Sequence, residues 1–534
     1  MLGGDGLSRS RLTRANSKRT PSLSSSIKSV VLASLIAATL LPSPALGHPG
    51  PSLDNREPPR SLSLFLQNPP VAEAFDKAMR DGTDAAAAGN PAGAITAFRR
   101  ALELEPEAFL AHRYLASALL QLERYDDALT VLAAAARLRP QEPSVLYTQA
   151  LTLTRLERFR EAIPYLEKAV AAYPGNADAW MLLGRLLTQY DGSLEAILRA
   201  TEAFEQAFEQ RPDSVEILLR LTRAYRRIGL YDEALELLYG AAKTGSIAVS
   251  LTLARAQIQM QVGSYQAAHA TLSQAIGAGA GALTYYQLGI VERNLGDLDA
   301  ARAALETATR LRPRLIEAIL ELGNLLIVRQ EFAAAKETLQ RAVEVAPENA
   351  KAHNLLGLAR LRAGDASSAV PYFERALALD PTLANAIYNL ALGLRDLGRI
   401  EQSLGTMDRF AVLNEKLEAD EITENRSTEI AIVNGRGLYY YRHGDSERAR
   451  EVFEQALELS PEDGLVHFNL GLAHAALGNH VQAVVAFERA IELNPTRPNA
   501  YAALAVEYRA LGRKEDAARM EARYRELRRD LPGW

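Results

Sequence analysis

Apolar and small residues recur along most of the chain at the spacing that amphipathic helices require. In residues 350–383, one such stretch is followed by a break at Gly364-Asp365, a second stretch and then a proline, Pro381. The spaced residues are His353, Leu356, Gly357 and Arg360 in the first stretch, and Ala369, Phe373 and Ala376 in the second. This pattern predicts two short helices joined by a tight turn, with Gly364 adopting the conformation that ends the first helix and Pro381 ending the second.

The pattern repeats with a period of 34 residues, which the prolines make visible. Prolines lie 34 residues apart at Pro106, Pro140 and Pro174, at Pro313, Pro347 and Pro381, and at Pro461 and Pro495. Thirteen repeats start near residues 75, 109, 143, 177, 215, 249, 282, 316, 350, 384, 430, 464 and 498; we number them 1 to 13 and count positions from each start. Repeat 4 carries four extra residues around 190–193, repeats 5 and 6 lack the closing proline, and repeat 10 loses its pattern after Leu404.

These recurring positions resemble the tetratricopeptide repeat (TPR) family, and the resemblance covers about 85% of the chain. It implies an all-α fold, a superhelical α-solenoid of about 13 stacked helix-turn-helix units. We expect repeats 1–10 in residues 71–414 and repeats 11–13 in residues 430–530. The acidic insertion between them, residues 415–429, is expected to extend a helix and form a loop that splits the array. The helix from Glu515 onward is polar almost all round, as a terminal cap requires.

The first 47 residues read as an export signal. A basic stretch is followed by an apolar one from Val30 to Leu41, and Ala45-Leu46-Gly47 offers small residues for cleavage. This predicts a periplasmic or secreted protein; the alternatives are an uncleaved signal that anchors the chain in the inner membrane, and an organelle transit peptide. Residues 48–70 are Pro-rich and read as a linker.

The net charge and the absence of cysteine exclude several classes of function. Loss of residues 1–47 removes six basic residues and one acidic residue, so the net charge falls from −5 to −10. That charge argues against general binding of nucleic acid or of anionic membranes. The absence of cysteine excludes disulfides, thiol catalysis and thiolate metal sites, and it suits an oxidising compartment.

No residue pattern indicates an enzyme, a cofactor or a metal site. The sequence lacks the phosphate-binding, zinc-protease and nucleophile-elbow motifs. His112, His353 and His467 all occupy position 4, where Trp180 and Tyr285 stand in other repeats, and His474 occupies a position that Tyr225 and Tyr508 share. A ring that packs between helices explains these positions better than a metal ligand does. We therefore expect a non-enzymatic protein.

The resemblance to TPR proteins implies that the first helix of each repeat lines a concave groove, with ligand contacts from positions 2, 5, 9, 12 and 13. The basic residues at these positions are Arg113, Arg155, Arg185, Arg223, Arg226, Arg227, Arg293, Lys351, Arg362, Arg395, Arg442 and Arg509. The acidic ones are Asp76, Asp178, Glu216, Glu317 and Asp396. Tyr147, Tyr286, Tyr388 and Phe468 add rings, and Asn324, Asn354, Asn385 and Asn434 add amides. The groove is thus more basic than the chain as a whole.

Arginine, tyrosine and asparagine together suit an extended peptide or an acidic chain. The competing interpretation is that the rings pack against neighbouring repeats and the arginines pair with nearby acids. The main hypothesis is a scaffold that recruits a protein partner in an envelope assembly. Two alternatives stay open: a module that binds an acidic polysaccharide in an export machine, and a regulatory subunit of a glycosyltransferase.

Overall fold

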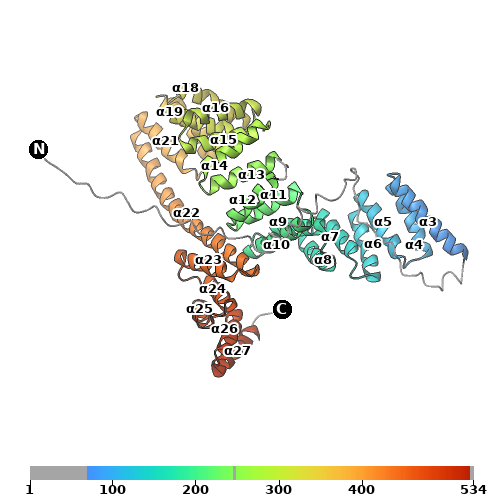
Figure 1. Cartoon of the computed structure of the whole chain (residues 1–534). Coiled ribbons are helices and arrows are strands. Elements are labelled where there is room, and N and C mark those ends of the chain that lie inside the picture. Colours follow the sequence, from blue (N-terminus) through green and yellow to red (C-terminus); the bar gives the residue numbers. More distant parts are fainter. Residues whose placement is uncertain (1–68, 244–247, 530–534) are drawn as a thin grey trace. The chain divides into compact units, whose positions relative to one another are not determined.

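The computed structural model describes residues 69–243 and 248–529, and every regular element in them is a helix. The 25 helices of these ranges, α3 to α27, follow one another in short antiparallel pairs (Figure 1). The all-α repeat architecture predicted from the 34-residue period is confirmed. The predicted export signal and residues 48–68 of the linker lie outside the described residues.

Each repeat contributes a first helix, here called A, and a second helix, called B. The A helices are α3 (Pro69–Ala87), α5 (Phe109–Gln121), α7 (Pro143–Arg155), α9 (Ala177–Tyr190), α11 (Val215–Arg227), α13 (Val249–Gln261), α15 (Ala282–Leu295), α17 (Ile316–Val328), α19 (Ala350–Arg362), α21 (Ala384–Asp396), α24 (Gly464–Ala476) and α26 (Pro498–Ala510). The B helices are α4 (Pro91–Leu104), α6 (Tyr125–Leu138), α8 (Phe159–Ala172), α10 (Leu194–Gln210), α12 (Tyr231–Lys243), α14 (Tyr265–Gly277), α16 (Leu298–Leu311), α18 (Phe332–Val345), α20 (Ala366–Leu379), α23 (Ser446–Leu459), α25 (His480–Leu493) and α27 (Lys514–Arg529).

The turn between the A and B helices follows from one backbone conformation at position 15. Gly364 has φ +84°, which costs glycine little because it has no Cβ. Glu123, Glu157 and Gln330 occupy the same position in repeats 2, 3 and 8 with φ of 57°, 58° and 63°. The packed helix pair therefore imposes the left-handed turn even where the sequence lacks glycine.

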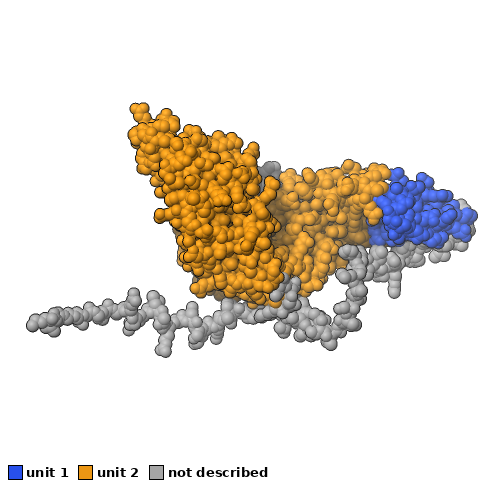
Figure 2. Space-filling model, turned by 90° about the horizontal axis from the view of Figure 1, so that it is seen from above, with its two compact units in different colours: residues 1–118 blue, residues 119–534 orange. Residues whose placement is uncertain are grey.

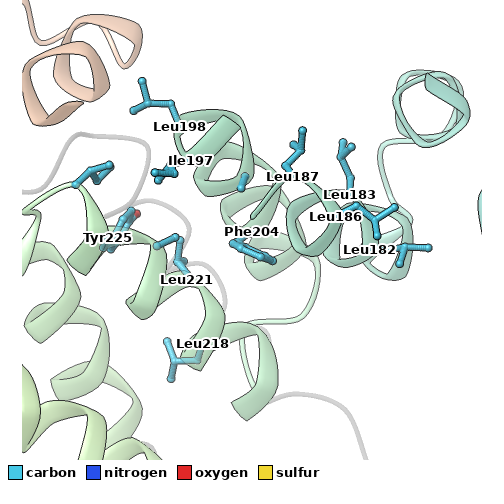
Figure 3. Close-up of a cluster of buried hydrophobic side chains, with 14 of the residues drawn as sticks. Leu182, Leu183, Leu186, Leu187, Ile197, Leu198, Phe204, Leu218, Leu221 and Tyr225 are labelled. Carbon is cyan, nitrogen blue, oxygen red and sulfur yellow. The ribbon is translucent and has the colours of Figure 1, made fainter. Parts of the chain in front are cut away.

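Close approach of the two helices explains the small residue at position 8. A Cβ added to Gly471 would lie 2.5 Å from Cε1 of Phe487, a ring on the paired B helix that is fully buried. The largest core cluster is built in the same way from successive helices (Figure 3). Its labelled side chains come from α9, α10 and α11, and include Leu186, Phe204 and Leu221.

The chain divides into two compact units, residues 1–118 and 119–534 (Figure 2). In the first unit, Phe75 and Ala78 of α3 share a core cluster with Ala101 of α4 and with Ala108 and Ala111. The second unit holds the remaining repeats and every residue of the acidic insertion.

The insertion extends a helix, as the sequence predicted, but it forms no loop, which corrects that part of the expectation. Helix α22 runs without interruption from Ile400 to Arg442, a length of 43 residues or about 64 Å. It serves both as the B helix of repeat 10, which packs on α21, and as the A helix of repeat 11, which packs on α23. Charged residues in the insertion favour helix as readily as loop, and nothing in residues 415–429 stops a helix, because they include neither proline nor glycine.

Candidate protein-binding surface

Positions 2, 5, 9, 12 and 13 of the A helices form what we call the A-helix surface. Four of its arginines are exposed on successive A helices: Arg155 on α7, Arg185 on α9, and Arg223 and Arg227 on α11. Within residues 69–243 and 248–529, no ion pair joins any of these four to a carboxylate. They are therefore available cations, and each lies on a helix held rigid by its buried side.

The other predicted arginines are engaged within the chain or lie apart from this group. Arg293 donates to Glu321 at 2.7 Å, and Arg226 donates to Gln257 at 3.4 Å. The guanidinium of Arg113 lies 5.1 Å from the centroid of the Tyr114 ring. Arg362 is exposed at the end of α19. The interpretation that arginines pair within the chain thus applies to some of them and not to the four on α7–α11.

The tyrosines at position 5 are partly buried between neighbouring A helices. Burial raises the pKa of Tyr147, and the negative charge of Asp178 adds to that effect while Arg185 opposes it. Burial also raises the pKa of Tyr286, with a contribution from Glu321. These rings stay neutral at physiological pH and can donate hydrogen bonds. Tyr388 is 40% exposed, and its ring centroid lies 5.3 Å from that of Phe410 on α22.

Asparagines pair across successive A helices in two places. Asn389 on α21 donates from Nδ2 to Oδ1 of Asn354 on α19, at 3.0 Å. Asn469 on α24 donates in the same way to Asn434 on α22, at 2.9 Å. All four asparagines are buried, at 3–7% exposed, so these bonds join successive A helices to one another. Asn324, on α17, is half-buried.

Asn389 and Asn469 were missed from the sequence because they occupy position 6, which the predicted ligand positions leave out. Their spacing carried the signal: both pairs are 35 residues apart in an array whose period is 34.

The rings at position 4 have a structural role in the connections between repeats. His353 Nε2 lies 2.8 Å from the carbonyl oxygen of Pro347, the residue that closes the preceding repeat. Trp180 Nε1 donates to the carbonyl of Pro174 at 2.8 Å in the same arrangement. The same contact recurs at His112, His467 and Tyr501. In these five repeats the ring at position 4 therefore bonds to the preceding connection, a role that periodicity alone does not reveal.

Helix α22 makes a contact far along the chain that no repeat position predicts. The Glu205 carboxylate on α10 accepts hydrogen bonds from Tyr225 at 2.7 Å and from Tyr439 at 2.8 Å, and lies 3.0 Å from His443 Nε2. Tyr440 donates to Glu233 of α12 at 2.7 Å. The carboxylate thus joins α10, α11 and α22 in one polar network.

The same contact occupies Arg442, which was predicted to face a ligand. Its guanidinium donates to Glu195 at 2.7 Å and to Glu202 at 3.0 Å, both on α10. A Cβ added to Gly435 would lie 2.7 Å from Cδ1 of Leu194, so the backbone of α22 approaches the start of α10 closely. In this structure Arg442 belongs to an intramolecular contact.

Burial and charge set the protonation of this network. Burial raises the pKa of Tyr225 and of Tyr439, and the neighbouring Glu205 charge adds to both shifts. His443 Nδ1 lies 2.8 Å from the carbonyl oxygen of Tyr439, so Nδ1 carries a proton. A hydrogen bond to the Glu205 carboxylate requires a second proton, on Nε2. Burial opposes that second proton, but the hydrogen bond to Glu205 and its charge outweigh it and raise the pKa of His443 above 6.5.

Comparisons with known proteins place this architecture in a family. Models described as tetratricopeptide repeats match residues 80–143, 147–196, 320–384 and 434–498, and further models of that repeat match residues 193–244, 282–315, 357–433 and 486–519. The chain belongs to the tetratricopeptide repeat family. Arrays of TPR units are protein-interaction scaffolds, and this chain is one of them.

Several named proteins resemble this TPR array over part of their length. The peroxisomal targeting signal receptor of Kluyveromyces lactis is 24% identical over 278 residues, which are 51% of this chain and 43% of that protein. Human protein O-mannosyl-transferase TMTC1 is 31% identical over 232 residues, which are 42% of this chain and 25% of that protein. This chain thus spans less than half the length of both relatives.

Among solved structures, Naa15/Naa10 bound to HypK-THB aligns at 17% identity with a TM-score of 0.37, covering 85% of this chain and 68% of that one. Cut9 in its complex with Hcn1 aligns at 13% identity with a TM-score of 0.29, covering 84% of this chain and 98% of that one. Within the residues described for this TPR array, none of the helices combines the length and apolar character that a bilayer crossing needs.

Proposed function

We propose that this TPR scaffold binds an extended, acidic segment of a partner protein along the A helices of repeats 3–5, and that the chain itself catalyses no reaction. The observation that carries the proposal is the set of exposed arginines Arg155, Arg185, Arg223 and Arg227, which lack a carboxylate partner in the described part of a chain with net charge −5. Arginine binds carboxylates through two parallel hydrogen bonds, so a ladder of exposed guanidinium groups favours a strand of acidic side chains.

Asn354, Asn389, Asn434 and Asn469 are 3–7% exposed and pair with one another, so they join successive A helices and leave the ligand contacts to the arginines of repeats 3–5. One relative that matches half of this chain is named as a targeting signal receptor, which fits the recognition of a peptide.

We further propose that this binding takes place outside the cytoplasm, in a periplasmic or secreted assembly of the cell envelope. The basic and apolar stretches of residues 1–47 and the absence of cysteine support this location. Mass spectrometry of the protein recovered from cell fractions tests it directly. An N-terminus at His48 in a periplasmic or secreted fraction is the expected result, and an intact N-terminus in the cytosol would refute it.

The binding proposal is tested with the full mature chain as bait for the envelope extract of its own cell. One variant carries Arg185→Ala, Arg223→Ala and Arg227→Ala. The matched control variant loses three exposed arginines from B helices, namely Arg137, Arg341 and Arg375. Circular dichroism establishes that both variants remain helical.

We expect a protein that the wild type and the B-helix variant retain and the A-helix variant loses, with retention falling as salt rises. Acidic polysaccharide lost in the same manner, without a protein, would replace the proposal by the polysaccharide-binding alternative. A glycosyltransferase captured equally by all three baits would favour the regulatory-subunit alternative. Any other protein retained equally by all three would show that the binding site lies outside the A helices of repeats 3–5.

A further inference from the structure

The face of repeat 10 that points along the array is left uncovered. In repeats 9 and 12, position 21 on the B helix holds Val370 and Val484, which are 4% and 5% exposed. In repeat 10 the same position holds Leu404, which is 61% exposed. Ile400, one helical turn earlier, is 51% exposed.

The next A helix explains the difference. A Cβ added to Gly393 of α21 would lie 3.1 Å from Cγ2 of Val370, so α21 covers that valine. Val484 shares a core cluster with Leu504 of α26, the A helix that follows it. No A helix follows Leu404 in this way, because α22 continues straight and its later residues bond to α10 and α12 instead.

The uncovered residues form one stripe on α22. Ile400, Leu404 and Ala411 are exposed and recur at intervals of four and seven, which is the spacing of one helix face. We call this stripe the α22 face. The chain's own last helix, α27, shows the contrast, because it has a single buried residue and is otherwise polar. Repeat arrays need such a polar cap where they end in water, and the α22 face is an apolar end without one.

Charges beside the stripe indicate what covers it. Glu401, Asp408 and Glu415 are exposed and lie seven residues apart, so they form an acidic edge along the α22 face. A second copy of this chain would bring an identical acidic edge to the seam, and the like charges would repel. A partner helix with lysine or arginine along one edge would instead pair with them.

We propose that the α22 face binds an amphipathic helix of a partner protein, in the place where the A helix of the next repeat would otherwise pack. The partner helix is apolar on one side, carries glycine or alanine opposite Leu404, and is basic along the edge that meets Glu401, Asp408 and Glu415. This interface is separate from the arginines of repeats 3–5, so the scaffold has two binding surfaces with opposite charge preferences.

The probe for this surface is a peptide built on α21, the A helix that covers Val370. It spans residues 382–398, carries Asn385→Lys and Asp396→Lys, and is acetylated, amidated and fluorescently labelled. These two positions are exposed on α21, so the changes add a basic edge and leave the packing face intact. Fluorescence anisotropy measures its binding to the full chain.

We expect the full chain to bind the probe, and Leu404→Lys to weaken that binding about tenfold or more. Val485→Lys is the matched control, because Val485 is 62% exposed on α25 and lies outside the α22 face. Leu404→Lys is expected to keep the melting temperature of the wild type, since its side chain already lies mostly in water. Glu401→Lys with Asp408→Lys is expected to weaken the basic probe and to leave binding of the unmodified 382–398 peptide almost unchanged.

Absence of binding to the wild-type chain would overturn the proposal, as would equal binding by the wild type and Leu404→Lys. Sedimentation velocity adds a third arm. A wild-type dimer that Leu404→Lys converts to monomer would assign the face to a second copy of the chain instead of a partner helix.

Discussion

The contact between position 8 and position 24 of each repeat supports a sharp prediction about helix packing. Wherever phenylalanine occupies position 24 in the described repeats, or position 28 in repeat 4 with its four extra residues, glycine faces it, and a Cβ added to that glycine would lie 2.5 to 2.7 Å from the ring. The pairs are Gly82 and Phe98, Gly184 and Phe204, Gly357 and Phe373, Gly437 and Phe453, and Gly471 and Phe487. Where leucine occupies position 24, the facing residue is either alanine or glycine: the pairs are Ala150 with Leu166, Ala256 with Leu272, Gly289 with Leu305, and Gly323 with Leu339. We therefore expect Gly471→Ala to destabilise repeat 12, and Phe487→Leu to reverse that loss.

The magnitude follows from two opposing effects at Gly471. Alanine in place of glycine inside a helix stabilises it by about 1 kcal/mol. The new methyl group would stand 2.5 Å from Phe487 Cε1, whereas carbon atoms in contact prefer about 3.5–4.0 Å, so the ring must retreat by about 1 Å. Overpacking of this kind costs about 1–3 kcal/mol, and the short distance places it near the upper end. The net expectation is a loss of about 1–2 kcal/mol.

Phe487→Leu alone is expected to cost about 1 kcal/mol, because it removes buried volume from a ring that is fully buried. Additive effects would make the double variant the least stable of the three. Steric coupling predicts the reverse: the double variant recreates the alanine–leucine pair of repeats 3 and 6 and recovers to near the wild type. The coupling energy is then about 2 kcal/mol.

Hydrogen exchange of α24 and α25 is the suitable assay, because an array of thirteen repeats does not unfold in one cooperative step. A change of about 1.4 kcal/mol alters the protection factor about tenfold. The reasoning is refuted if the double variant exchanges faster than Gly471→Ala. Exchange of α15 and α16 serves as an internal control, and we expect it to remain unchanged in all three variants.

Three further predictions concern packing and the contact of α22. Ala369→Leu is expected to cost about 1–3 kcal/mol, because Ala369 is fully buried where the helices approach, whereas Arg362→Ala should leave the melting temperature unchanged; equal losses in differential scanning calorimetry would contradict this. Because the pKa of His443 is raised, its ion pair with Glu205 stabilises the contact fully below about pH 6.5, and this stabilisation is lost as the pH rises through the raised pKa. Hydrogen exchange of residues 436–443, corrected for intrinsic rates, should show the loss of protection. The variant His443→Gln should abolish this pH dependence. Tyr439→Phe removes one donor from the Glu205 carboxylate and should cost about 1–2 kcal/mol, seen as faster exchange in both α10 and the end of α22; faster exchange in α22 alone would show that the bond does not couple the two helices.

Local periodicity was sufficient to predict the helix pairs, because each repeat contacts mainly its neighbours and the same positions are buried each time. The role of Gly364 in the turn and that of Ala369 in the helix contact could therefore be predicted without the structure. The left-handed conformation of Glu123 and Gln330 could not be predicted, because packing imposes it and the residue type does not indicate it.

Periodicity could not predict the contact of α22 with α10, because this contact joins residues more than two hundred residues apart in the sequence and does not recur in other repeats. Two irregularities in the sequence nevertheless pointed to it. Repeat 4 has four extra residues, and the structure uses them to lengthen α10 at its start, where Leu194 and Glu195 meet α22. The other irregularity is the insertion after repeat 10, which extends α22 to that contact. Departures from a repeat therefore locate long-range contacts better than the repeat itself does.

The continuity of α22 ties the length of the insertion to the orientation of everything after it. Each residue added to or removed from a continuous helix rotates the following part by about 100° and shifts it by about 1.5 Å. A single deletion within residues 415–429 would thus turn Tyr439 and His443 away from Glu205. In natural variants of this chain, the length of this segment should accordingly differ by whole turns, in steps of about seven, eleven or eighteen residues that restore the helical phase.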